Sequence, residues 1–129
     1  MKPKPILCLD FDGVLHSYTS GWKGADVIPD PPVPGAIEFI QRAVEHFRVA
    51  IFSSRSHQPG GIDAMKDWLC VNTEIGFRDK PAWIDQIEWP TEKPLALVTI
   101  DDRAITFTGT WPAIESLLTF QPWNRKPPA

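Results

Sequence analysis

The chain is poor in cysteine, with only Cys8 and Cys70 among 129 residues. Two cysteines without a CxxC pair or metal-spaced histidines exclude a zinc finger and a disulfide scaffold, so both are expected to be buried thiols. Long apolar runs are also absent. The stretch before Asp10 holds four consecutive apolar residues, too few for a secretory signal or for a membrane span of about 20 residues. We therefore expect a cytoplasmic protein with no membrane partner.

The chain also has no excess of positive charge, since the formal net charge is −3 and the pI is about 5.5. This balance excludes a nucleic-acid coat protein, because affinity for phosphate backbones comes from clustered Lys and Arg. The charge therefore does not indicate a nucleic-acid partner. A local basic pocket that binds one is left as an alternative. No internal repeat is present, and the length predicts a single domain over residues 1–129. Oligomerisation is left open.

Three short apolar runs lack polar alternation, at residues 6–9, 49–52 and 95–100. Such runs are typical of strands buried on both faces of a parallel sheet. Short strands are also expected at 86–89 and 104–107. Ten of the fourteen prolines gather in 29–34, 81–94 and 122–128 and mark loops, the last within a proline-rich tail at 122–129.

Helical patterns separate the apolar runs. The first follows Gly35, with an apolar stripe from Ile37 to Phe47, and the second begins at Gly60-Gly61. A third is expected after Trp111-Pro112, where proline suits a first helical turn. These helices are expected to turn the following residues toward the core: Ile37, Ile40, Ala43, Val44 and Phe47; Ile62, Met65 and Leu69; Ile114, Leu117 and Leu118. Strands alternating with helices predict a layered α/β sheet with right-handed crossovers.

Polar clusters follow all three apolar runs: DFDG at 10–13, SSR at 53–55 and DDR at 101–103. The carboxyl ends of parallel strands meet at one edge of the sheet, where ligands bind in open α/β folds. Three separate pieces of sequence therefore converge on one candidate site.

Four carboxylates are expected at this edge, those of Asp10, Asp12, Asp101 and Asp102. Two like charges about 4 Å apart repel by about 4 kcal/mol at an effective dielectric near 20, so the cluster requires a cation. Oxygen ligands without His or Cys favour Mg²⁺, which commonly also binds a substrate phosphate. All four are candidate metal ligands.

A phosphate beside these carboxylates suggests nucleophilic catalysis. Asp10 can attack phosphorus to form an aspartyl-phosphate, while Asp12 protonates the leaving oxygen and later activates water. The hydroxyl of Ser53, backbone N–H groups and a lysine can stabilise the phosphoryl oxygens. Lys93, just before the third apolar run, is the preferred lysine, and Lys80 is the alternative.

The neighbours of Ser53 have two roles each to consider. Ser54 is included among the phosphate-binding residues, although a structural role suits it too. Arg55 can contact the phosphate through its planar fork or orient an adjacent carboxylate. Tyr18 and Trp22 belong to a stretch at 13–34 that is expected to form a short flap.

The four motifs resemble those of the haloacid dehalogenase superfamily of phosphohydrolases: DFDGV at 10–14, IFSS at 51–54, Lys93, and IDDR at 100–103. The resemblance spans about residues 5–110. It implies a three-layer Rossmann-like core with a mainly parallel sheet, obligatory Mg²⁺ and an aspartyl-phosphate intermediate. It makes Asp10 the nucleophile and a metal ligand, and Asp12 the acid/base whose backbone carbonyl meets the metal.

By the same resemblance, Ser53 and Lys93 bind the phosphate, and Asp101 and Asp102 complete the magnesium site. Val14 departs from the threonine that is common at its position. The chain has no room for a full cap domain, and capless relatives tend to accept large substrates or to borrow a lid from a neighbouring subunit. The substrate class therefore stays open.

The sequence thus predicts a Mg²⁺-dependent phosphatase that hydrolyses phosphomonoesters. Two alternatives remain: a catalytically inactive module that keeps the fold and binds phosphate or a partner, and a phosphatase specific for nucleotides or nucleic-acid ends. Transfer to an acceptor other than water shares the same intermediate. Retention of both Asp10 and Asp12 disfavours the inactive module.

Overall fold

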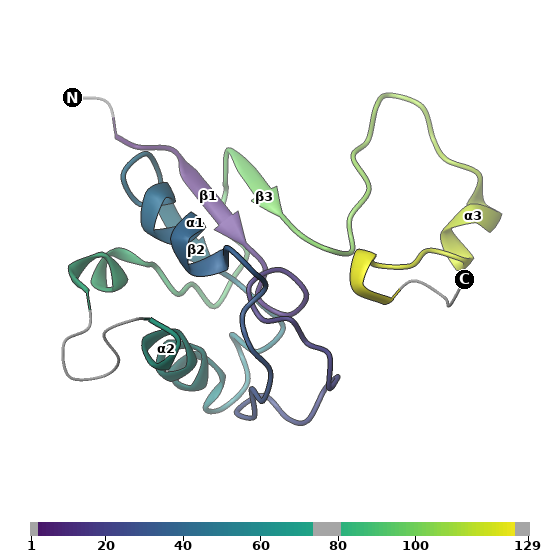
Figure 1. Ribbon diagram of the computed structural model, residues 1–129. Coiled ribbons are helices and arrows are strands. Elements are labelled where there is room, and N and C mark those ends of the chain that lie inside the picture. Colours follow the sequence, from purple (N-terminus) through teal and green to yellow (C-terminus); the bar gives the residue numbers. More distant parts are fainter. Residues whose placement is uncertain (1–2, 74–80, 126–129) are drawn as a thin grey trace.

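The computed structural model describes residues 3–73 and 81–125, so Lys80 lies outside the described residues. Figure 1 shows a small α/β arrangement with a three-stranded sheet. The elements in chain order are β1 (Ile6–Leu9), α1 (Ala36–Ala43), β2 (Arg48–Ile51), α2 (Gly61–Val71), the 3₁₀ turn η1 (Ala82–Gln86), β3 (Val98–Ile100), α3 (Ile114–Leu118) and the 3₁₀ turn η2 (Trp123–Arg125). None of the described helices is long and apolar enough to cross a membrane.

The sheet is parallel, with the strand order β2-β1-β3. Leu7 pairs with Val49 on one side and with Val98 on the other. This order, in which the first strand lies between the second and the third, is consistent with a Rossmann-like fold and confirms the expected parallel α/β class. It also places the carboxyl ends of all three strands side by side.

One face of the sheet carries the hydrophobic core. Leu7 and Leu9 of β1 lie on the same face as their register partners in β2, because side chains two residues apart share a face. Helices α1 and α2 cover this face and bury Ile40 and Met65 completely. The first two predicted helices are therefore confirmed, although α1 ends at Ala43, before the apolar stripe does.

The third apolar run is less buried than expected. Only Val98–Ile100 forms a strand, at the edge of the sheet, and the side chain of Leu97 is 70% exposed. An edge strand has a single neighbour, and no described helix covers this one. The run at 86–89 is reduced to an isolated bridge between Ala50 and Glu88. An apolar pattern indicates a strand but does not separate a central position from an edge.

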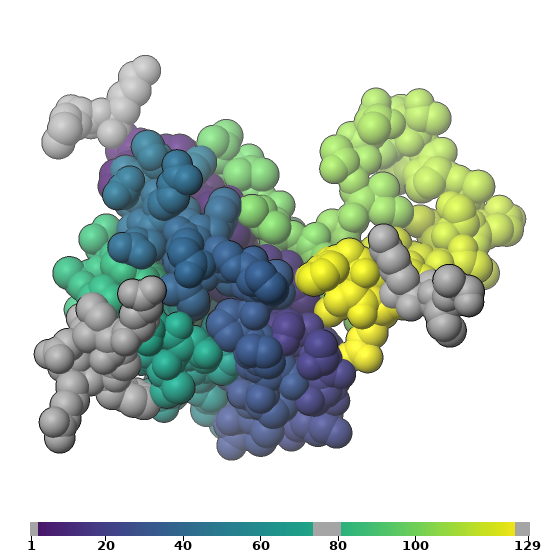
Figure 2. All heavy atoms as spheres, in the orientation of Figure 1, coloured from purple at the N-terminus to yellow at the C-terminus, as the bar shows by residue number. Residues whose placement is uncertain are grey.

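Residues 104–120, which we call the arm, correct two further expectations. No strand forms at 104–107, and α3 begins near its expected position but buries none of its residues. Leu118, expected to face the core, is 86% exposed. Local propensity can form a helix of five residues, but docking needs a facing apolar surface, and the arm points away from the sheet (Figures 1 and 2). The expected three-layer core needs helices on both faces of the sheet, and α3 does not provide the second helical layer.

The stretch at 13–34 contains turns and isolated bridges but no helix or strand, so there is no cap domain. The C-terminal turn η2 holds the start of this flap in place. The indole Nε1 of Trp123 donates to the carbonyl of Gly13 at 2.8 Å, and Arg125 donates to the carbonyl of Tyr18 at 3.0 Å. The arm is thereby joined to the rest of the molecule at both ends.

Candidate metal and phosphate site

Three carboxylates meet where β1 and β3 end. Asp10 follows β1, and Asp101 and Asp102 follow β3; one oxygen from each lies within 4.8 Å of the others. The parallel register brings them together, since Leu9 is paired with Ile100 and the N–H of Asp10 donates to the carbonyl of Ile100 at 3.0 Å. Three hard oxygen donors in this spacing can hold a metal ion such as Mg²⁺. The convergence predicted from sequence is present for these three residues.

Gly13 allows the first loop to pass close to this cluster. Its φ is +82°, and a Cβ at this position would collide with the carboxylate of Asp102. Glycine is therefore required here for two reasons, the left-handed backbone and the space beside a candidate metal ligand.

Asp10 is the electrostatically strained member of the cluster. The pKa of Asp10 is raised to about 8, chiefly by burial and also by Asp101 and Asp102, against the opposing effect of the N–H of Phe11, which donates to it at 2.8 Å. The carboxyl group therefore holds a proton near neutral pH unless a cation replaces it. A cation at this cluster would release that proton and leave Asp10 ionised.

This proton predicts a pH-dependent response to Mg²⁺. Between the ordinary carboxyl value of 3.8 and about 8, the folded state binds more protons at Asp10 than the unfolded chain does, so the free energy of unfolding of the metal-free protein falls as pH rises. Because Mg²⁺ competes with the proton, it should raise Tm more at about pH 8.5 than at about pH 6. Thermal melts with Mg²⁺ and with chelator measure this directly.

The control for this prediction is Asp10→Asn, which cannot titrate at that position. The difference in Tm between wild type and this variant should change with pH, and the variant should lose most of the Mg²⁺ effect. An equal Mg²⁺ effect on wild type at both pH values would show that the proton on Asp10 and the cation do not compete.

Asp12 lies apart from the acidic cluster and is held by two partners. Its Oδ1 accepts hydrogen bonds from Nδ1 of His16 at 2.9 Å and from Nη2 of Arg55 at 3.1 Å, and its Oδ2 accepts one from Nε of Arg55 at 2.9 Å. Burial alone would raise the pKa of Asp12, but the bonds from His16 and Arg55 outweigh it and hold that pKa below its usual value. Asp12 is therefore a fixed carboxylate, and the metal contact expected of its backbone carbonyl remains a prediction.

Arg55 is fully buried and has little freedom to bind a substrate. Its Nη1 donates to the carbonyls of Gly24 and Ala25 at 2.8 and 2.9 Å, and its guanidinium lies 4.7 Å from the ring centroid of Trp22. Its other two nitrogens, Nε and Nη2, donate to Asp12. Of the two roles expected for Arg55, this arrangement matches the second, in which the arginine orients a neighbouring carboxylate. It also connects the flap to the carboxyl end of β2.

His16 is a site residue that belongs to none of the sequence motifs. It is completely buried; the N–H of Asp30 donates to its Nε2 at 3.1 Å, which leaves Nδ1 to carry the proton donated to Asp12. Its ring also packs against Phe11 and Trp68. Only the spacing of four residues from Asp12 pointed to this contact, and such spacing in a loop carries little structural information.

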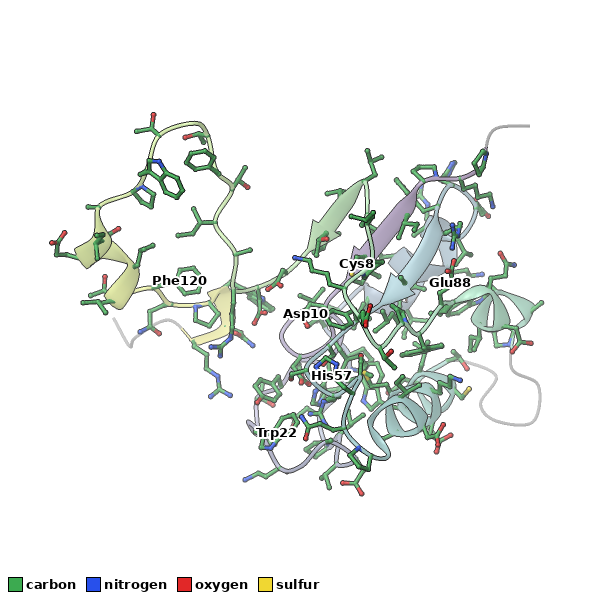
Figure 3. The ribbon with its side chains drawn as sticks, turned by 180° about the vertical axis from the view of Figure 1, so that it is seen from behind. Cys8, Asp10, Trp22, His57, Glu88 and Phe120 are labelled. Carbon is green, nitrogen blue, oxygen red and sulfur yellow. The ribbon has the colours of Figure 1, made fainter. Side chains whose placement is uncertain are left out.

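A pocket of about 490 Å³ opens beside the acidic cluster. Figure 3 shows Asp10 and Cys8 near the end of β1, with Trp22 on the flap. Residues from all three strand ends and from the flap line the pocket: Cys8, Asp10, Asp12, Tyr18, Trp22, Phe52, Ser53, Ser54, Lys93, Thr99, Asp101, Asp102 and Arg103. Apart from Arg55, every residue singled out for chemistry in the described part of the chain therefore borders one cavity.

Ser53 is a buried serine whose hydroxyl is held by a local hydrogen bond. It is 3% exposed, its N–H donates to Oγ of Ser56 at 2.9 Å, and its own Oγ accepts from the N–H of Arg55 at 3.2 Å. A hydroxyl that accepts in this way keeps its hydrogen to donate. Ser54 is exposed at the same strand end, and Lys93 is exposed on the lining of the pocket.

Comparison of the chain with protein-family models, with curated proteins and with solved structures found no significant match. Functional inference therefore rests on the arrangement of the residues themselves.

Proposed function

We propose that this chain is a Mg²⁺-dependent phosphomonoesterase of the haloacid dehalogenase type, acting through an aspartyl-phosphate on Asp10. The observation that carries the proposal is the meeting of three carboxylates, a buried serine hydroxyl and a lysine in one pocket at the carboxyl end of a parallel sheet. This combination provides anionic oxygens for a hard cation and donors for the phosphoryl oxygens. Neither set alone would specify a phosphate ester.

In the first half of the reaction, a carboxylate oxygen of Asp10 forms a bond to phosphorus while the bond from phosphorus to the leaving oxygen breaks. Mg²⁺ bound to Asp10, Asp101 and Asp102 would neutralise the carboxylates and polarise the phosphoryl group. Ser53, Ser54 and Lys93 donate to the phosphoryl oxygens as charge develops there. Arg55 is left out of this set because it is fully buried and its three nitrogens already donate to Asp12 and to carbonyls of the flap.

Asp12 moves the protons. Its depressed pKa keeps Asp12 ionised, so it is free to accept a proton from the water that attacks the phosphoaspartate. The proton taken from that water is the one Asp12 gives to the leaving oxygen in the first half of the next turnover. Among the described residues, Oδ2 accepts from a single donor, Nε of Arg55, so it retains a lone pair for this exchange. His16 and Arg55 act through Asp12 as positioning residues.

The proposal is tested by assaying phosphate release from an aryl phosphate and from a panel of nucleoside monophosphates, with Mg²⁺ and with chelator. Turnover that requires Mg²⁺ supports a phosphomonoesterase, and the ranking of the panel narrows the substrate class. Absence of turnover on every ester, under conditions in which Mg²⁺ raises Tm, would favour a binding module instead.

Lys93 should contribute strongly to this turnover. Lys93→Met keeps a long side chain but removes the charge that faces the phosphate, and we expect kcat/KM to fall by about 10²-fold or more, the usual effect of removing one preorganised donor. The matched control is Lys66→Met, an exposed lysine of α2 that does not line the pocket. Equal activities of the two variants would remove Lys93 from the site and favour a different cation there.

A further inference from the structure

The arm carries an apolar surface that no other described part of the chain covers. Every residue from 103 to 121 is exposed, and the exposure of apolar side chains is greatest at Leu118 (86%), Trp111 (82%) and Ile114 (76%). Figures 1 and 2 show this segment standing away from the rest of the molecule, and Figure 3 places Phe120 on it, far from Asp10. A contiguous surface of this kind in water is typical of an interaction site.

The composition of the arm defines the chemistry of its partner. Glu115 is the only charged residue between 104 and 120. The arm therefore does not suit a nucleic acid or a strongly charged ligand, which would be bound through clustered charges. Its aromatic and aliphatic side chains suit another apolar protein surface.

A complementary surface is present on the same chain. No strand of the described residues pairs with the outer edge of β3, and Ile100 of β3 lines an apolar groove of about 300 Å³ together with Leu9, Val14 and Phe39. Ile100 and Phe39 are 39% and 46% exposed. The apolar run that contains β3 has the pattern of a strand buried on both faces, whereas its side chains at Leu97 and Val98 are 70% and 47% exposed in the part of the chain that the structure describes.

We propose that a second copy of this chain covers both surfaces, with the arm of each copy lying in the groove and along the β3 edge of the other. The exchange is self-complementary, as a two-fold dimer requires. Seven exposed apolar side chains, each offering on the order of 100 Å², give an arm roughly 700 Å² of contact surface. Two arms and the surfaces they cover exceed the roughly 1,200 Å² of a specific interface. This proposal stands independently of the proposed function.

A second copy is favoured over an unrelated partner because it accounts for both features at once. An unrelated apolar protein on the arm would leave the β3 edge and the groove exposed, and open strand edges are a liability for aggregation. The net charge of −3 is too small to keep two copies apart.

The test is the mass of the full chain in solution, measured by sedimentation equilibrium over a roughly hundredfold range of concentration. We expect a dimer for wild type and a monomer for the arm variant Leu118→Asp and the groove variant Phe39→Asp. The matched control is Val71→Asp on α2, an apolar residue of similar exposure (57%) outside the arm and the groove, which should remain dimeric. Circular dichroism and thermal melts establish that each variant is folded.

Mixing the two variants tests the reciprocal arrangement. A Leu118→Asp chain keeps an intact groove, and a Phe39→Asp chain keeps an intact arm, so the mixture should form heterodimers with one of the two contacts while each variant alone stays monomeric. A wild type that is monomeric at every concentration would overturn the proposal. A dimer that survives either substitution, or variants that fail to complement, would equally overturn the exchange of arms.

Discussion

Asp10→Asn should abolish phosphate release, lowering kcat by at least about 10³-fold, because the amide is a far weaker nucleophile than the carboxylate it replaces. The side chain keeps its size and one oxygen, so substrate can still enter the pocket. The measurement is Mg²⁺-dependent phosphate release from an aryl phosphate by wild type and variant.

The same substitution should not destabilise the protein. Since burial and the neighbouring carboxylates raise the pKa of Asp10 to about 8, a neutral amide removes repulsion within the cluster. We therefore expect a Tm at about pH 8.5 equal to or above that of metal-free wild type. Asp67→Asn on the exposed side of α2 is the matched control for activity. Full activity in Asp10→Asn would exclude Asp10 as the nucleophile.

Arg55→Met should cost about 3–5 kcal/mol of unfolding free energy, because it leaves the carboxylate of Asp12 largely buried without its cation. The arginine side chain is completely buried and that of Asp12 is 14% exposed. The variant also removes the hydrogen bonds to the carbonyls of Gly24 and Ala25 and thereby frees the flap from β2. Urea unfolding measures the change, and Arg55→Lys, which restores charge without the bidentate fork, should recover part of it.

The chain offers a matched control for this ion pair. Arg48 and Glu88 also make two hydrogen bonds, at 2.8 and 2.9 Å, but their side chains are 51% and 41% exposed. Arg48→Met should cost far less than Arg55→Met, because solvent already screens that pair. Equal losses in the two variants would mean that burial of the Asp12–Arg55 pair does not set its contribution.

The candidate site could be predicted from sequence because its geometry follows from strand order. Once three apolar runs form parallel strands, Asp10, Ser53 and Asp101 must meet at the same sheet edge, whatever the loops do. The first two helices were equally predictable, since Ile40 and Met65 belong to periodic apolar stripes that face a buried sheet.

What could not be predicted depends on contacts distant in sequence. Arg55 reaches back 43 residues to Asp12 and about 30 to the flap, and no local pattern records which partner a buried arginine chooses. The burial of His16 against Trp68 could not be predicted for the same reason. The exposed third strand and the arm show a second limit, because periodicity states that a surface is apolar and leaves open what covers it.

The most direct test of the central claim is to trap the phosphoaspartate. Wild-type protein is mixed with an aryl phosphate and Mg²⁺, quenched in borohydride, and its peptides are analysed by mass spectrometry. An acyl phosphate is reduced to an alcohol, so we expect Asp10, and none of the other aspartates, to become homoserine when both substrate and Mg²⁺ are present. Phosphate release with Asp10 left intact would contradict a covalent mechanism, and modification at Asp12, Asp101 or Asp102 would contradict the assignment of the nucleophile.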